Sequence, residues 1–310
     1  MTGSLYSSLQ HRFSERVRFD EPMSRHTSFR IGGPADVWIE VEDAGELLHV
    51  QRAAVDAGVP LSVVGIGTNV LISDRGVRGV VVKLGRGFTG IEWSRQGKVM
   101  RARAGAASPF KKLVFEAVVR DLTGLEFAEG IPGSIGGGLL MNAGAFGGEM
   151  SDVVDSVEAV AAEVGRKRFA RTELSFGYRR FDLPAGFVIV AVDFLLPLGD
   201  GSEIRDRMSK AKRKRESKQP LGLPNAGSIF KNPPGEHAGR LIDAAGLKGC
   251  RVGGAMVSPD HANFIVNVDR ARAADVKSLM DQIVDAVWQE NQIRLVPEIR
   301  LVGDWGASAR

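Results

Sequence analysis

Two adjacent glycine-rich segments, residues 130–138 and 142–148, constrain the fold of this chain more than any other feature. They have the sequences GIPGSIGGG and NAGAFGG. Glycine adopts left-handed backbone conformations freely and destabilises helices and strands, so this region cannot be regular structure throughout. Loops of this length inside compact domains usually have a function. The two segments therefore favour a large ligand-binding loop over a purely structural connection.

A third glycine segment, residues 65–71, has the sequence GIGTNVL and follows a short apolar stretch typical of a buried strand. Backbone N–H groups can approach a phosphate closely where no Cβ is in the way. The segment is not a Rossmann fingerprint, because Val70 occupies the position of the third glycine, and no P-loop lysine follows it. Alone it would be a tight turn. Together with residues 130–148 it indicates a large cofactor with a pyrophosphate, bound by another fold.

The remaining pattern predicts alternating strands and helices, which is typical of an α/β unit. The first regular element is expected after Gly32, Gly33 and Pro34. Strands are expected at residues 37–41, 61–64, 80–84, 99–104, 153–164 and 187–196, and helices at residues 44–57, 109–120, 203–218 and 272–291. The strands at 153–164 and 187–196 are long, β-branched and apolar, as paired strands would be. The last helix has an apolar stripe formed by Val276, Leu279, Met280, Ile283 and Val287. A domain boundary is expected near residue 200.

Composition excludes several classes of protein. The 310 residues include one cysteine, Cys250, so neither an intrachain disulfide nor a cysteine zinc site can form, and no metal site is expected. No segment has the apolar length of a membrane span or a signal peptide, so a cytoplasmic protein is expected. The net charge of +4 is mild. The basic run at residues 210–218 is best interpreted as a solvated helix face rather than a nucleic-acid site.

Several motifs, taken in order, resemble those of the UDP-N-acetylenolpyruvoylglucosamine reductase family. Each is weak alone, but together they are specific and cover the chain from about residue 19 to residue 303. They are TSFRIGGPA at 27–35, GIGTNVL at 65–71, GIPGSIGG at 130–137, NAGAFG at 142–147, YR at 178–179, NAGSIFKNP at 225–233 and VPEI at 296–299.

The resemblance implies an α+β fold. An FAD-binding module of two α/β subdomains, of the vanillyl-alcohol-oxidase or PCMH type, would occupy residues 1–200, and a C-terminal α+β substrate-binding domain residues 201–310. FAD would be held without a covalent bond, and NADPH would be the hydride donor. The implied cofactor-binding residues are Gly65, Ile66, Gly67, Thr68, Asn69, Val70, Leu71, Gly133, Ser134, Gly136, Gly137, Asn142 and Gly144.

The reaction implied by the resemblance is the reduction of UDP-N-acetylglucosamine enolpyruvate to UDP-N-acetylmuramate, a step in peptidoglycan precursor synthesis. Arg179 and Glu298 would bind and polarise the substrate carboxylate, and Ser228 would donate a proton to C2. Glu298 would then need to be protonated or water-bridged beside the anion. Tyr178, Lys218 and Asn232 would contact the UDP substrate. Without the resemblance, Arg179, Ser228 and Glu298 would be interpreted as a surface charge, a turn residue and an exposed strand residue.

Two departures and two alternatives remain open. Phe181 stands where the family often has serine, which questions the local support of Arg179. The short separation between Arg179 and Ser228 resembles the class that lacks an inserted loop with a lid tyrosine. The alternatives are a flavin oxidase of the same cofactor fold and a nucleic-acid-binding protein acting through the basic helix. His261 is interpreted as a structural residue beside a turn, and the oligomeric state is left open.

Overall fold

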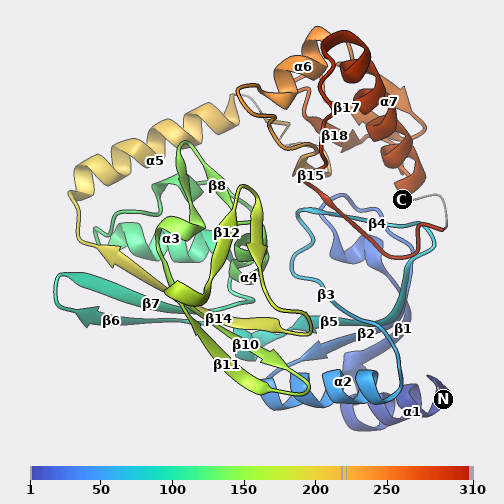
Figure 1. The fold of residues 1–310 in the computed structure, drawn as a ribbon, viewed down its shortest axis with the longest axis vertical. Coiled ribbons are helices and arrows are strands. Elements are labelled where there is room, and N and C mark those ends of the chain that lie inside the picture. Colours follow the sequence, from blue (N-terminus) through green and yellow to red (C-terminus); the bar gives the residue numbers. More distant parts are fainter. Residues whose placement is uncertain (1, 218, 221, 307–310) are drawn as a thin grey trace. The chain divides into compact units, whose positions relative to one another are not determined.

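The computed structural model describes residues 2–217, 219–220 and 222–306 (Figure 1). Two compact units make up the chain, each from three separate stretches. Unit 1 comprises Met1–Arg18, Trp38–Gly65 and Gly79–Arg215, and unit 2 comprises Phe19–Val37, Ile66–Arg78 and Glu216–Arg310. Unit 2 thus includes residues from the first hundred of the chain, and the domain boundary near residue 200 stays a prediction.

Unit 1 contains a five-stranded sheet with helices packed against it. Its helices are α1 (Thr2–Phe13), α2 (Ala44–Asp56), α3 (Phe110–Val119), α4 (Ile135–Leu140) and α5 (Gly201–Glu216). Its strands include β3 (Leu61–Val63), β6 (Ile91–Gln96), β7 (Val99–Gly105), β8 (Gly144–Ala145), β9 (Gly148–Glu149), β10 (Val154–Ala161), β11 (Gly165–Ala170), β12 (Ser175–Gly177), β13 (Arg180–Asp182) and β14 (Val188–Pro197).

The five-stranded sheet has the order β11-β10-β14-β7-β6, and all its neighbouring strands are antiparallel. The expected pairing of residues 153–164 with 187–196 is confirmed, because β10 pairs with β14. Side chains alternate between the two faces along each strand. Ala102, Ala104, Val192 and Phe194 belong to the buried core that also contains residues of α3 and α4. One face of the sheet therefore forms the core of unit 1.

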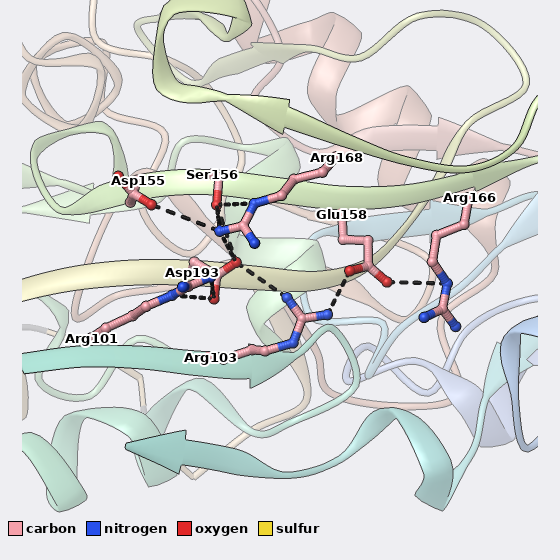
Figure 2. Close-up of polar contacts among 8 residues, drawn as sticks. All are labelled: Arg101, Arg103, Asp155, Ser156, Glu158, Arg166, Arg168 and Asp193. Carbon is pink, nitrogen blue, oxygen red and sulfur yellow. Dashed lines mark hydrogen bonds and ion pairs between the residues drawn. The ribbon is translucent and has the colours of Figure 1, made fainter. Parts of the chain in front are cut away.

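Polar and charged side chains from β7, β10, β11 and β14 form a cluster centred on Asp193 (Figure 2). Asp193 is fully buried. Its carboxylate lies 2.9 Å from Arg101 Nη2, 3.2 Å from Arg103 Nη1 and 3.0 Å from Arg168 Nη2, and it accepts a 3.1 Å hydrogen bond from Ser156 Oγ. A buried carboxylate is stable only when it is paired and hydrogen-bonded. Arg101 and Arg103 on the neighbouring strand β7, with Arg168 on β11, meet that requirement.

A second sheet has the order β1-β2-β5-β3, where β1 is Val17–Pro22, β2 is Pro34–Val41 and β5 is Val77–Leu84. The pair β3–β5 is parallel, as expected for the predicted α/β unit. The expectation that regular structure begins after Pro34 is wrong, because α1 and β1 precede it. Leu5, Leu9 and Phe13 recur every four residues along α1 and are buried, a helical stripe hidden in a polar segment.

Unit 2 is a smaller α+β structure. Its elements are β4 (Val70–Ile72), β15 (Asn225–Ser228), α6 (Ala238–Ala244), β16 (Arg251–Val252), β17 (Ala255–Val257), β18 (Phe264–Asn267), α7 (Ala273–Asn291) and β19 (Arg300–Val302). The strand order is β15-β18-β17-β16, and α7 packs against β16 and β17 (Figure 1). The predicted apolar stripe of α7 is confirmed, since all five of its residues are buried in the core of unit 2.

Two further contacts complete unit 2. The N-terminus of α7 is capped from a distant stretch, because Asp74 accepts hydrogen bonds from the amides of Ala273 and Ala274 at 2.8 and 2.9 Å. The strand β4 pairs in parallel with β19, with Val70 opposite Arg300. Across the described residues, no helix is both long enough and apolar enough to cross a membrane.

Candidate active site

The loop at residues 65–69 offers a row of backbone donors. In the described part of the chain, none of its five amide N–H groups donates to a protein acceptor. Gly67 has a φ of +71° and packs so closely on the backbone that a Cβ there would overlap the carbonyl oxygen of His26. A Cβ at Gly65 would lie 2.8 Å from Ser134 Oγ, so Gly65, which belongs to unit 1, lies against the glycine segment at residues 130–138. Donors and glycines together fit an anionic diphosphate.

The second glycine segment is held against α3 by backbone hydrogen bonds. Phe110 N donates to Gly133 O and Gly136 N donates to Ala106 O, both at 2.9 Å. Ser134 is the N-cap of α4, and its Oγ accepts from Gly137 N at 3.3 Å. A Cβ at Gly136 would lie 3.0 Å from that of Ala106, so any other residue there would press on Ala106 and close packing favours a glycine. The expected irregular region thus contains one short helix, with exposed Gly137 in its first turn.

Arg179 lies at the tip of the hairpin formed by β12 and β13. Its backbone is left-handed, with a φ of +53°, a conformation that strains a non-glycine residue and often marks functional sites. Its Nη2 donates a 2.6 Å hydrogen bond to Gly144 O, and its guanidinium lies 5.0 Å from the ring of Tyr178. Buried Asn142 donates to Gly177 O at 3.2 Å and so ties the glycine segment to the same hairpin.

Phe181 provides the local support that the sequence left in question. Only 6% of it is exposed, and its ring lies 4.8 Å from that of Phe176 on the opposite strand of the hairpin. Aromatic pairs across antiparallel strands stabilise hairpins. The hydrophobic contact therefore supports the turn that carries Arg179.

Two cations of the basic run contact the tip of the β8–β9 hairpin, which the sequence analysis did not anticipate. The Lys214 Nζ and the Arg215 guanidinium lie 5.5 and 5.6 Å from the ring centre of Phe146. The pKa of Arg215 is lowered, because the effect of its burial outweighs the opposite effect of the nearby Glu129 charge. Part of the run therefore packs on the glycine region, and no local pattern in the sequence identifies these two positions.

Ser228 ends β15, in unit 2, just after an irregular step in the strand. Asn225 pairs with Val266 and Ser228 with Phe264, so the two strands differ in length by one residue between these pairs. Gly227, at a φ of +74°, forms part of this bulge, and its N–H donates to Asn225 Oδ1 at 2.9 Å. Bulges redirect side chains and are frequent beside active sites. Ser228 is half-buried, and its hydroxyl makes no hydrogen bond with any described residue.

Glu298 lies beside Ser228 in the same unit. Its N–H donates to the carbonyl of Ile229 at 2.7 Å. Its carbonyl accepts from Asn69 Nδ2 at 3.2 Å. Unit 2 therefore brings together the glycine loop, the strand of Ser228 and the segment of Glu298, which lie far apart in sequence. Of the three predicted catalytic residues, Ser228 and Glu298 thus belong to unit 2 and Arg179 belongs to unit 1.

The other predicted residues have varied surroundings. Leu71 is fully buried in the core of unit 2, while Ile66 and Tyr178 are about half exposed. Asn232 is exposed, and its Oδ1 accepts from Ala238 N at 3.1 Å. Lys218 lies outside the described residues. His261 Nδ1 accepts from Asn263 N at 3.2 Å in a turn, which agrees with the predicted structural role.

Ser28, in the motif at residues 27–35, contacts both the glycine loop and β15, although the sequence did not predict it as a site residue. Its N–H donates to Gly67 O at 3.0 Å, and its Oγ lies 2.6 Å from Asn225 O and 3.2 Å from Gly67 O. The residue thus joins the glycine loop to the start of β15. The only sequence signal was the motif itself, since the partners lie far away along the chain.

Comparison with known proteins first defines the class. A family profile described as an FAD-binding domain matches residues 35–166. This match includes the loop at residues 65–71 and the segment at 130–148. Together with the mixed helices and strands, it identifies a flavoprotein with an FAD-binding domain and a further C-terminal domain.

The particular family follows from longer matches. A profile of the C-terminal domain of UDP-N-acetylenolpyruvoylglucosamine reductase matches residues 219–302. UDP-N-acetylenolpyruvoylglucosamine reductase 2 of Symbiobacterium thermophilum is 44% identical over 94% of this chain and 92% of its own length. The reductase of Syntrophus aciditrophicus is 44% identical over 94% of each chain. The chain belongs to the UDP-N-acetylenolpyruvoylglucosamine reductase family.

A solved structure of the same family agrees. The crystal structure of the reductase from Thermus caldophilus has a TM-score of 0.79 and 38% sequence identity to this chain. The match covers 93% of this chain and 99% of the Thermus caldophilus chain. The predicted family, fold class, FAD cofactor and oxidoreductase activity are confirmed, and the matches support the reductase rather than the oxidase alternative.

Proposed function

We propose that this chain reduces the enolpyruvyl ether of UDP-N-acetylglucosamine enolpyruvate to UDP-N-acetylmuramate with NADPH. The pyrophosphate of FAD would be held by the N–H groups of residues 65–69, and the cofactor would also contact the segment at residues 133–144. When bound, FAD supplies hydride transfer from NADPH to C3 of the enolpyruvyl group, which no side chain can carry out. A cytoplasmic location is part of the proposal.

The residues of the chain then act on the charge that develops at C2. Arg179 and Glu298 would bind and polarise the substrate carboxylate as negative charge spreads into it. The Ser228 hydroxyl would donate its proton to C2, forming the new C–H bond, and the resulting alkoxide would recover a proton from solvent. Lys218 and Asn232 would contact the diphosphate, and Tyr178 would contact the substrate beside Arg179.

The observation that carries the proposal lies in unit 2. The bond from Glu298 N–H to Ile229 O and the bond from Asn69 Nδ2 to Glu298 O join the backbone of Glu298 to the residue that follows Ser228 and to the glycine loop. A structural turn residue would not require this convergence. The free hydroxyl of Ser228 within the described residues supports a role toward a ligand rather than toward the fold.

The test is anaerobic stopped-flow kinetics of the Ser228→Ala variant. NADPH should reduce its flavin at the wild-type rate, whereas oxidation of the reduced flavin by the enolpyruvyl substrate should nearly cease. Wild-type turnover by this variant would refute the proton-donor role. Re-oxidation of the wild-type enzyme by O₂ alone, faster than by the substrate, would instead favour the oxidase.

A further inference from the structure

We infer that Ser28 is a positioning residue for proton transfer, because its hydroxyl holds the carbonyl that begins the β15 bulge preceding Ser228. The inference rests on the proposed function, in which Ser228 is the proton donor. Ser28 would act through the backbone and would touch neither substrate nor cofactor.

The hydroxyl of Ser28 makes a short polar contact with the first residue of β15. Its Oγ lies 2.6 Å from Asn225 O, against 3.2 Å from Gly67 O. A hydroxyl has one proton to donate, so the shorter contact is the principal hydrogen bond. The amide of Ser28 separately donates to Gly67 O at 3.0 Å. The side chain thus holds β15, and the backbone holds the glycine loop.

The segment around Ser28 is rigid. Thr27 Oγ1 donates to Ile31 O at 2.9 Å, and Asn267 Nδ2 donates to Phe29 O at 3.0 Å. Thr27 is buried and Phe29 is fully buried. A hydroxyl on such a segment can fix a partner carbonyl with little loss of its own conformational freedom.

The carbonyl that Ser28 holds belongs to the first residue of the bulge. Asn225 also closes the bulge from inside, through its side-chain bond to Gly227 N–H. The bulge is therefore fixed at its start by Ser28 and across its middle by Asn225. Since Ser228 follows directly, the direction of its hydroxyl depends on both bonds. A displacement of about 1 Å in a reacting group can cost on the order of 100-fold in rate.

Replacement of Ser28 by Ala separates the two contacts. The amide bond to Gly67 O remains, so FAD affinity and flavin reduction by NADPH should match the wild type. Oxidation of the reduced flavin by the enolpyruvyl substrate should slow by about 10-fold, with an increased solvent deuterium isotope effect. Ser28→Thr restores the hydroxyl and should recover most of the rate. Ser94→Ala, at an exposed position of β6, is the matched control.

Two further measurements separate positioning from general damage. Hydrogen exchange of the peptide at residues 225–230 in the FAD-loaded protein should be faster in Ser28→Ala, with exchange elsewhere unchanged. Asn225→Ala should reproduce the kinetic defect, and the double variant should be no slower than either single one, because both bonds fix one bulge. If Ser28→Ala does not accumulate as folded protein, Asn225→Ala and Ser28→Thr still carry the test.

The outcomes are distinct. Wild-type oxidation of the reduced flavin in Ser28→Ala, with loss in Ser228→Ala, refutes the inference and leaves the proposed function intact. Weaker FAD binding without a change in the oxidation step also refutes it, since Ser28 would then serve the cofactor loop. Normal turnover in Ser228→Ala refutes the proposed function and removes the basis of the inference.

Discussion

Replacing Asp193 by Asn tests whether the charged cluster on the unit 1 sheet depends on its central carboxylate. The substitution keeps the size of the side chain and removes its charge. Asp193 is fully buried and lies within 3.2 Å of guanidinium nitrogens of Arg101, Arg103 and Arg168. The variant would remove the anion that these three cations share, leaving Glu158 beside Arg103 and Asp155 beside Arg168 (Figure 2).

The expected cost follows from the burial of the Asp193 carboxylate and the partial exposure of its arginine partners. Removing one member of a buried ion pair typically costs about 3–5 kcal/mol. The side chains of Arg101 and Arg103 are 24% and 32% exposed, so solvent relieves part of this penalty. We therefore expect Asp193→Asn to lower the free energy of unfolding by about 3 kcal/mol, at the lower end of that range.

Urea unfolding followed by circular dichroism measures this change as a lower midpoint with an unchanged slope. The control is Arg166→Gln, because the side chain of Arg166 is 60% exposed and pairs with Glu158 at 3.2 Å. An exposed pair is worth about 0–1 kcal/mol. If Asp193→Asn costs no more than this control, the carboxylate does not hold the cluster together and the reasoning is wrong.

Three further predictions concern other parts of the chain. Asn263→Ala should lower the free energy of unfolding by about 2–4 kcal/mol, because Asn263 exchanges hydrogen bonds of 3.0 and 2.8 Å with the backbone N–H and C=O of buried Phe230. Burial raises the pKa of Glu126, but hydrogen bonds, chiefly from Arg207, lower it more, so its net shift is downward. The ionised Glu126 therefore stabilises the folded state above its ordinary pKa of about 4.5, and this stabilisation is lost as the pH falls toward the lowered pKa. Glu126→Gln should accordingly flatten the acid limb of a plot of thermal midpoint against pH. Arg179→Gln should raise KM for the enolpyruvyl substrate and slow its reduction, leaving flavin reduction by NADPH unchanged in stopped-flow traces.

Each of these predictions has a contrary result. Asn263→Ala with a wild-type urea midpoint would mean that water replaces both lost bonds. An acid limb equally steep in Glu126→Gln and wild type would assign acid sensitivity to other carboxylates. An unchanged KM and turnover in Arg179→Gln would make its left-handed turn a purely structural feature.

Periodic patterns in the sequence predicted regular elements well. The stripe of α7 was evident because five apolar residues recur at helical spacing over a long segment. The stripe of α1 was missed because only Leu5, Leu9 and Phe13 carry it among polar neighbours. The pairing of β10 with β14 was accessible because both strands are β-branched and apolar.

Contacts between distant residues could not be predicted in this way. Ser28 and Asn225 are separated by 197 positions, and nothing in either local sequence indicates the other. The seven-motif resemblance supplied the candidate residues, but not the bonds that hold them. The contact of Arg215 with Phe146 is of the same kind, since an arginine in a basic run gives no sign of the aromatic ring it covers.

The pairing of β4 with β19 has a consequence for folding during synthesis on the ribosome. Val70, Leu71 and Ile72 lie opposite Arg300, Leu301 and Val302, which come 230 residues later in the chain. The strand that follows the glycine loop therefore cannot pair with β19 until residues 300–302 have left the ribosome. Parallel partners so far apart also join slowly. We therefore expect FAD binding to require the chain through Val302, so that a nascent polypeptide stalled before Arg300 should remain colourless.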